Sequence, residues 1–248
     1  MNKILKLSVF LLTACVLGSA MSCLAEVMPP PGPPITQGVG VPPIGMNAPA
    51  ISPIERVGKG VIRVGKVTVN KNIRSISFPA QINMTQGLLE YVLVRTGGKT
   101  HESLFRTETE PYDIQLACIL LDLIGTDKPL PYQGAQDIPK GDHVAINVSF
   151  LDKNGKVHEI QTEKLVTKFI DGKPVVIDSL KWIYVGSWVN DSRFMAQVDG
   201  SIIALYHDPV AIFDNASPGG ESDKIWFVNE KTVPPVGTPV TITIKAVK

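Results

Sequence analysis

Cysteine is scarce in this sequence, and its scarcity excludes several kinds of site. Three cysteines occur, and Cys15 and Cys23 lie within the first 25 residues. If that segment is a cleaved secretion signal, only Cys118 remains. One thiol cannot form an internal disulfide, a four-cysteine zinc site or an iron–sulfur cluster. Cys118 lies in the apolar run 114–121, so we expect a small buried core residue, and we expect no cofactor and no metal.

An excess of charge of one sign is also absent. The net charge is +1 and there is no long basic run, so the sequence shows no electrostatic footprint for nucleic acid and no polybasic membrane patch. The patterns HExxH, GxSxG and CxxC do not occur, which removes familiar hydrolase and redox signatures. Gly98-Lys99-Thr100 imitates a phosphate-binding loop, but Leu93 stands where that motif needs glycine. We therefore expect neither a nucleic-acid partner nor a phosphate-binding loop.

Long apolar runs are missing except at the N-terminus, where the pattern is that of a secretion signal. Lys3 and Lys6 precede the apolar run 7–18, and Cys23-Leu24-Ala25 is an acceptable cleavage site before Glu26. The run is too short for a transmembrane helix, so we expect no transmembrane span. The sequence predicts a signal peptide over residues 1–25 and a secreted or periplasmic protein.

A lipoprotein signal is the alternative at this end of the chain. Leu12-Thr13-Ala14-Cys15 resembles a lipobox, in which Cys15 would carry a lipid and anchor the protein to a membrane. Cleavage there would leave the apolar residues 16–18 at the mature end, where a polar tether is more usual. Simple secretion is therefore favoured, and the lipid anchor at Cys15 stays open.

Proline is concentrated in one segment that follows the signal. Residues 28–34, 41–45 and 48–53 are proline-rich, and such a sequence favours an extended polyproline II spacer over helix or sheet. We assign residues 26–57 to a proline-rich tether. The remaining 58–248 form one globular domain of sufficient size to bury a core.

Within that domain most of the pattern is that of strands joined by tight turns. Gly97-Gly98, Asn154-Gly155 and Asp199-Gly200 each lie between two β-rich runs and are typical of hairpin turns. The sequence thus predicts three hairpins, with strands over 88–95 and 100–105, 144–151 and 157–162, and 194–198 and 202–206. Residues 239–244 are expected to form a closing strand.

One stretch has the pattern of a helix. Pro111 fits a first helical turn, apolar residues follow on nearly all sides, and Gly125 marks the end, so the helix should be buried against a sheet. A shorter helical turn is possible over 162–169. The expected fold class is α+β, mostly antiparallel β hairpins with one buried helix. Trp182, Tyr184 and Trp188 would share one strand face, as core residues in preference to a stacking surface for a sugar or a partner.

The segment 99–103 holds the chemistry-bearing residues that attract attention first. His101, Glu102 and Ser103 supply an imidazole, a carboxylate and a hydroxyl. On a strand His101 would share a face with Ser103 and not with Glu102, so a metal site would need further donors from elsewhere. The histidine-bearing options are His143, His158 and the pair His207-Asp208. Single histidines on strands are usually hydrogen-bonded structural residues.

The order of these segments resembles the YdjY-like domain of bacterial exported proteins. The resemblance runs from about Gly60 to the C-terminus, and its most specific part is the string Gly-Lys-X-His-Glu-Ser at residues 98–103. It includes the helical segment, Trp182, Gly186-Ser187, Asp199-Gly200 and the stretch 233–240. The resemblance implies a candidate binding site of Lys99, His101, Glu102 and Ser103, and it implies no particular activity. Some relatives carry a ferredoxin-like label, which Cys118 alone cannot support.

These observations favour an exported protein of the cell envelope with a non-enzymatic binding or structural domain. Its partner would be another envelope protein or a small ligand. The alternative is a hydrolase or a metal-dependent enzyme that uses His101 and Glu102. The sequence contains no motif strong enough to name a reaction.

The signal predicts how the chain is processed. Protein recovered from the envelope should begin at or near Glu26, because the small residues before it fit the signal peptidase. N-terminal sequencing and intact mass measure this directly. A diacylglyceryl group on Cys15 would show that the lipoprotein alternative is correct.

Overall fold

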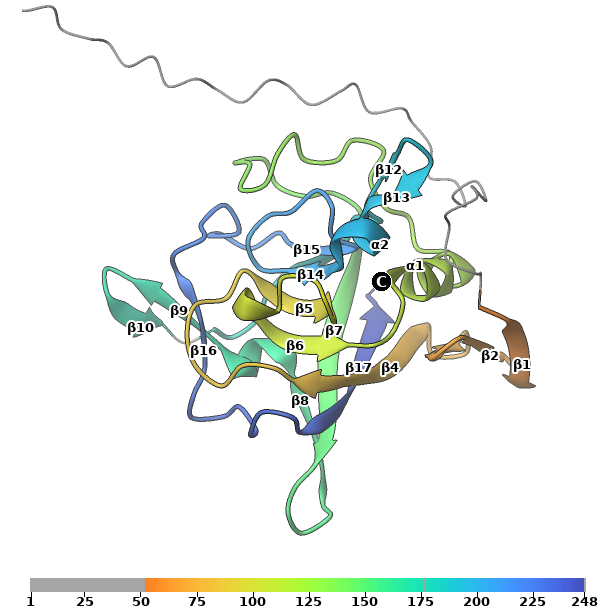
Figure 1. Cartoon of the computed structure of the whole chain (residues 1–248), viewed down its shortest axis with the longest axis horizontal. Coiled ribbons are helices and arrows are strands. Elements are labelled where there is room, and N and C mark those ends of the chain that lie inside the picture. Colours follow the sequence, from red (N-terminus) through yellow and green to blue (C-terminus); the bar gives the residue numbers. More distant parts are fainter. Residues whose placement is uncertain (1–51, 176, 248) are drawn as a thin grey trace, which may run out of the picture. The chain divides into compact units, whose positions relative to one another are not determined.

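The computed structural model describes residues 52–175 and 177–247 (Figure 1). The signal assigned to 1–25, Cys15 and residues 26–51 of the tether lie outside this part of the chain. The described strands are β1 (Ile54–Gly58), β2 (Val61–Val64), β3 (Val67–Asn70), β4 (Ser75–Ile82), β5 (Tyr91–Arg95), β6 (Ser103–Thr107), β7 (Asp142–Leu151), β8 (Val157–Gln161), β9 (Val166–Ile170), β10 (Lys173–Val175), β11 (Trp182–Tyr184), β12 (Val189–Asn190), β13 (Arg193–Phe194), β14 (Ser201–Ala204), β15 (Phe213–Asn215), β16 (Trp226–Val228) and β17 (Pro239–Ala246). The helical elements are α1 (Pro111–Leu120), α2 (Met195–Asp199), η1 (Thr100–Glu102) and η2 (Thr162–Leu165).

Eight of the strands close into a barrel. Their order around the wall is β4-β17-β7-β11-β15-β14-β5-β6, and β6 returns to β4. The closing contact is short: Gln81 pairs with Arg106 and Ile82 with Phe105. The long strand β17 pairs over nearly its whole length with β4 on one side and with β7 on the other. Two neighbouring pairs, β5–β6 and β14–β15, are parallel.

Other strands extend from this wall. β3, β2 and β1 continue the sheet outward from β4, and β8 pairs with the projecting end of β7 (Figure 1). β1 begins at Ile54, so residues 54–56, which the sequence places in the tether, already pair with β2. Separate small sheets are formed by β10-β9-β16 and by β12-β13.

The expected α+β class is wrong. Strands make up 41% of the structure and helices 11%, and α1 is the one described helix with seven or more residues, so the fold is mostly β around a closed barrel. The hydrophobic pattern along the chain identifies individual strands, but it carries no information about a ring that closes between β4 and β6. The barrel is decided by pairing between separate segments, which local periodicity does not encode.

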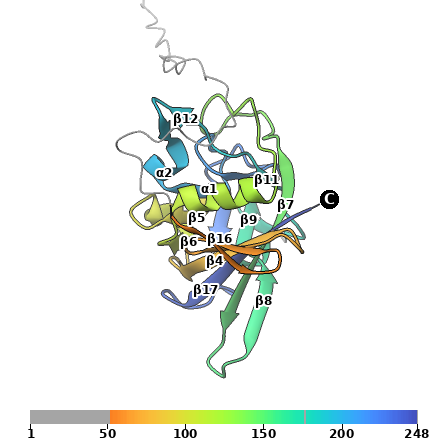
Figure 2. The ribbon, with the colours of Figure 1, turned by 90° about the vertical axis from the view of Figure 1, so that its right-hand side faces the viewer.

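The predicted buried helix is confirmed and is shorter than expected. α1 begins at Pro111, packs against β2, β3 and β4, and has no exposed residue (Figure 2). It ends at Leu120, before Gly125, because Asp122 adopts a left-handed backbone with φ 57°. Cys118 is fully buried in this helix, and burial raises the pKa of its thiol, so the prediction of a small core residue is confirmed.

The barrel interior holds the expected aromatic core. Trp182 and Tyr184 of β11 are buried, and the ring of Tyr184 lies 5.6 Å from that of Phe213 on β15. Trp188 lies beyond the end of β11 and is half-buried. The closing strand over 239–244 is confirmed as part of β17, and the helical turn predicted within 162–169 corresponds to η2.

One of the three predicted hairpins is confirmed. β7 and β8 pair antiparallel across Asn154-Gly155, where Gly155 has φ 76°. The carboxylate of Asp152 closes this turn by accepting hydrogen bonds from the backbone N–H groups of Asn154 (2.8 Å) and Lys156 (3.0 Å). This segment is therefore a hairpin turn, as its sequence indicates.

The other two hairpins are wrong, and a shared contact explains both. β5 and β6 are parallel, and Phe194–Val198 is largely the helix α2, which Gly200 terminates with φ 82°. Gly98 and Gly200 lie against each other: a Cβ on Gly98 would be 3.1 Å from the carbonyl oxygen of Asp199, and one on Gly200 would be 3.2 Å from the Cα of Gly98. Gly97-Gly98 does turn the chain, since the N–H of Gly98 donates to the carbonyl oxygen of Arg95 (2.9 Å), but the turn leads to a parallel strand. Gly98 and Gly200 also permit the close approach of two chain segments.

No helix within residues 52–175 and 177–247 has the length and apolar character to cross a membrane.

The alternation along β17 predicts which of its side chains hold the barrel together. Ile242 is fully buried between β4 and β7, whereas Thr241 is exposed. Ile242→Ala should therefore lower the free energy of unfolding by about 2–5 kcal/mol, through lost burial and the cavity left behind. Thr241→Ala should change it by less than about 1 kcal/mol. Urea unfolding of both variants measures the difference, and equal losses would contradict this inward–outward assignment.

Candidate functional site

The structure separates the four residues predicted as a site. His101 and Glu102 lie on the 3-10 helix η1 and not on a strand, so the expected alternation of their side chains does not apply. His101 Nε2 lies 3.5 Å from Glu102 Oε2, and the His101 side chain is 78% exposed. Ser103 opens β6, is buried, and donates a hydrogen bond to the carbonyl oxygen of Phe105 (2.7 Å). Ser103 therefore has a structural role, and His101 faces solvent.

Lys99 turns instead toward a buried polar chain. Its Nζ lies 2.7 Å from the hydroxyl of Tyr91 and 3.3 Å from Asp199 Oδ2. The Tyr91 hydroxyl in turn donates to Asp208 Oδ2 (2.8 Å). Burial and the neighbouring Asp208 carboxylate both raise the pKa of Tyr91, so its hydroxyl keeps its proton as a donor. The sequence motif is thus linked to Asp208, although more than a hundred residues separate them along the chain.

Glu102 contributes to a second group of polar side chains beside this one. Burial and the nearby Glu102 carboxylate raise the pKa of Glu90, which precedes β5. Gln133 Nε2 donates to Glu90 Oε2 and to the Tyr91 hydroxyl, each at 3.2 Å. Gln133 belongs to the long connection between α1 and β7, so this connection is tied to the barrel wall at the motif.

The other histidines do not converge on His101. His207 is buried, and its two ring nitrogens each lie 2.8 Å from a backbone carbonyl oxygen, those of Ala135 and Asn215. His158 pairs with Asp152 at 2.8 Å in the β7–β8 hairpin, and His143 is exposed on β7. Among the described residues no group of three or more His, Cys, Asp or Glu side chains is arranged to hold a metal ion.

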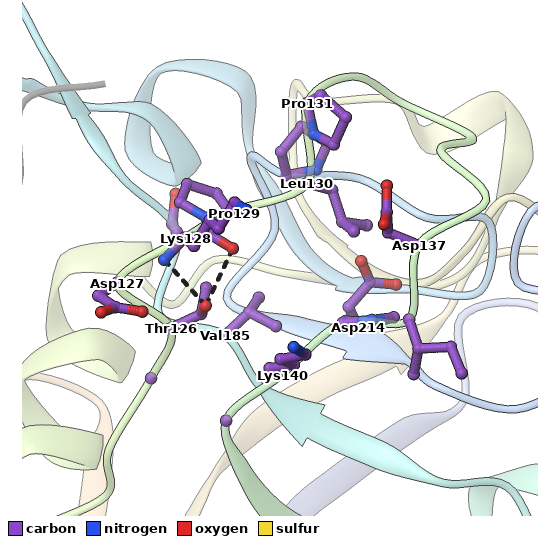
Figure 3. A pocket seen from close by; sticks show the side chains of 16 residues that line it. Thr126, Asp127, Lys128, Pro129, Leu130, Pro131, Asp137, Lys140, Val185 and Asp214 are labelled. Carbon is purple, nitrogen blue, oxygen red and sulfur yellow. Dashed lines mark hydrogen bonds between the residues drawn. The ribbon is translucent and has the colours of Figure 1, made fainter. Parts of the chain in front are cut away.

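A pocket of about 790 Å³ lies where the α1–β7 connection crosses the outside of the barrel (Figure 3). Residues 125–131 and 137–141 form one side, and Val185, Ser187, Pro209 and Asp214 form the other. The segment 121–141 contains no helix or strand, and unstructured connections of this length are usually functional. Ser187 stands in the wall with a left-handed backbone (φ 55°), held by its hydroxyl bond to Val210 O (2.6 Å).

Asp214 is the buried polar residue of this pocket. Its carboxyl accepts hydrogen bonds from the backbone N–H groups of Asn215 (2.7 Å) and Asp208 (3.2 Å). The residue is 1% exposed, and burial raises its pKa well above that of an ordinary aspartate, with a smaller contribution from Asp208. Asp208 therefore connects Asp214 to Tyr91 and Lys99, so the polar chain from the motif ends at the pocket.

The sequence reasoning missed both Asp214 and the pocket. Asp214 carries no motif, since it is one aspartate within a short β-rich run. A signal did exist in 125–141, where Gly125, Pro129, Pro131, Pro139 and Gly141 interrupt any regular pattern. Such a stretch inside a compact domain indicates a functional loop, although not the residues that it covers.

These features define a mostly β domain with a pocket, lined mainly by apolar residues and containing buried Asp214, on the outer wall of a closed barrel. A family model, the YdjY domain, matches residues 67–245, which is more than half of the 248-residue chain. The chain therefore belongs to the YdjY domain family, and the resemblance drawn from the order of its motifs is confirmed. No curated protein and no solved structure matches the chain.

The geometry predicts that Tyr91, and not His101, supports stability in this region. Tyr91→Phe removes the hydroxyl that joins Lys99 to buried Asp208, leaving the carboxylate without that donor. It should lower the free energy of unfolding by about 1–3 kcal/mol. His101→Ala should lower it by less than about 1 kcal/mol, because the ring faces solvent.

Thermal and urea unfolding of the two variants beside the parent test this. Tyr132→Phe is the matched control, since Tyr132 is 60% exposed and the same hydroxyl removal should have no effect there. A loss for His101→Ala as large as that for Tyr91→Phe would mean that the imidazole is a structural element.

Proposed function

We propose that this protein is an exported, non-enzymatic binding protein of the cell envelope whose ligand site is the pocket between residues 125–141 and the barrel wall. The observation that carries the proposal is Asp214, a carboxyl group buried at the wall of that pocket. A buried acid costs folding free energy unless it is paired, so its presence at a cavity is typical of a functional site. Export rests on the basic and apolar pattern of residues 3–18.

The construction of the pocket favours binding over a purely structural role. One side is a long connection without regular structure, and the other is the barrel wall, which fixes Asp214 through two backbone N–H groups. A rigid wall faced by a loop is a common arrangement for binding a small ligand. The pocket volume of about 790 Å³ also falls within the range of small-molecule sites.

The alternative, a hydrolase or metal-dependent enzyme that uses His101 and Glu102, has one supporting observation. The two side chains lie 3.5 Å apart, within reach of an ion pair. A catalytic cluster would need Lys99 or the pair His207-Asp208 to converge on them. Lys99 points instead to Tyr91, and both ring nitrogens of His207 face backbone oxygens. The pocket containing Asp214 is therefore the better-supported site.

Fragment binding followed by NMR tests the proposal. A defined library of water-soluble fragments is titrated into the protein recovered from the envelope, and backbone amide shifts locate each one. Hits with dissociation constants near ~1 mM are expected to shift the amides of Thr126, Ile138 and Lys140, which line the pocket. Ile138→Trp should weaken these hits at least about threefold by obstructing the mouth, equivalent to about 0.7 kcal/mol or more.

Val236→Trp is the matched control, because Val236 is similarly exposed and does not line the pocket. It should leave the affinities unchanged. A second pocket along β9 and β16 contains Phe169 and Phe227, whose rings lie 4.9 Å apart. Hits that gather there, or shift no pocket amide, would show that the ligand site has been placed wrongly.

A further inference from the structure

We infer that the pocket holds its ligand through a protonated primary amine, which sits between the carboxyl groups of Asp214 and Asp137 while an apolar part contacts Leu130 and Val185. This rests on the proposed function, since it names the chemical class that the same pocket selects. All four residues line the pocket, where Figure 3 shows Asp137 and Leu130 on the connection and Asp214 on the barrel wall.

Asp214 has hydrogen-bond donors but no positively charged partner among the described residues. The ion pairs among the described residues join Arg95 to Glu110, Lys99 to Asp199, His101 to Glu102 and His158 to Asp152, and none includes Asp214. Its hydrogen bonds come from two neutral backbone N–H groups. An ammonium group in the pocket would supply the missing positive charge and donate hydrogen bonds as well.

Strand pairing turns the side chain of Asp214 toward the pocket side of the barrel wall. Asp214 pairs with Ile183 of β11, which pairs in turn with His143 of β7, so these three side chains project to the same face of the sheet. Their neighbours Phe213 and Tyr184 point to the barrel interior, where their rings contact each other. Asp214 therefore projects outward, toward the connection that carries Asp137 (Figure 3).

The other charged groups around Asp214 favour a positively charged group on the ligand. Asp208 adds negative charge from the segment before β15, and Asp137 does so from the opposite side. Lys128, Lys140, Asp127 and Asp137 all line the pocket at exposed positions, so water and salt screen their charges, and the buried carboxyl group of Asp214 is screened least. His143 is exposed and lies two strands away. An anionic group beside Asp214 would face the charge of its carboxylate in a buried setting.

This arrangement predicts a pH dependence with a definite sign. Burial raises the pKa of Asp214 well above that of an ordinary aspartate, so the carboxyl group of the free protein holds its proton to a higher pH than an exposed aspartate would. An ammonium ion binds the ionised carboxylate, and the displaced proton passes to the buffer. Affinity for an amine should therefore rise with pH, by up to tenfold per unit, until the pKa of free Asp214 is passed. Affinity for an uncharged probe should not rise.

Three probes of equal length separate the possibilities: n-butylamine, butyrate and n-butanol. Each is titrated into the full protein from about pH 6 to about pH 8, where the amine stays protonated, with amide shifts as the readout. The expected result is that butylamine shifts the pocket amides, binds at least tenfold more tightly than butyrate, and gains affinity with pH. Equal or tighter binding of butyrate or butanol in the pocket would overturn the amine inference and leave the proposed function standing. If no probe shifts a pocket amide, both fail.

Two variants assign the effect to the acids. Asp214→Asn keeps the shape of the neutral carboxyl group and should lose both the pH dependence and at least tenfold in amine affinity. Asp137 is exposed, so Asp137→Asn should fold even if Asp214→Asn does not. It should weaken the binding of the amine severalfold. Asp178→Asn removes an exposed carboxylate outside the pocket and should change nothing. Unchanged amine binding in Asp214→Asn or Asp137→Asn would contradict the inference.

Discussion

The short pairing between the end of β4 and β6 is the contact on which the rest of the structure depends. Only Gln81 and Ile82 take part on one side, opposite Arg106 and Phe105, yet this ladder closes the eight-stranded wall. β6 runs parallel to β5, so the chain must return through η1 before β6 begins. Closure satisfies the backbone groups that an open edge would leave unpaired. It also gives the wall a fixed inside and outside.

The division between inside and outside organises the chemistry. The interior is apolar and aromatic, with Trp182, Tyr184 and Phe213 among its side chains. Polar groups that cannot enter it gather on the outer surface of β5, β14 and β15, under the α1–β7 connection. There a hydrogen-bonded chain leads from Lys99 through Tyr91 to Asp208, and Asp208 reaches Asp214 through its backbone N–H. One polar region therefore joins the motif at residues 98–103 to the pocket, which the sequence did not predict.

Residue patterns predicted the local elements well where a single segment decides the outcome. Pro111 and the apolar residues after it identified α1, and Asn154-Gly155 identified the β7–β8 turn. Residue patterns gave wrong predictions where two segments that are far apart in the sequence meet. Gly97-Gly98 and Asp199-Gly200 have the sequence pattern of hairpin turns. In the structure, the absence of a side chain on Gly98 and Gly200 lets β5 and β14 approach each other there. A glycine needed for close contact and one needed for a positive φ are identical in the sequence.

For the candidate site too, some features were predictable from the sequence and others depended on the tertiary structure. The sequence by itself determined the buried helix, the apolar role of Cys118, the aromatic core residues and membership of the YdjY domain family, because composition, periodicity and ordered motifs carry these. Only the tertiary structure decided that His101 faces solvent, that Lys99 turns inward, and that Asp214 is buried at a pocket. The physical reason is that burial and pKa depend on neighbours from other strands, and those neighbours are set by ring closure and not by the adjacent residues.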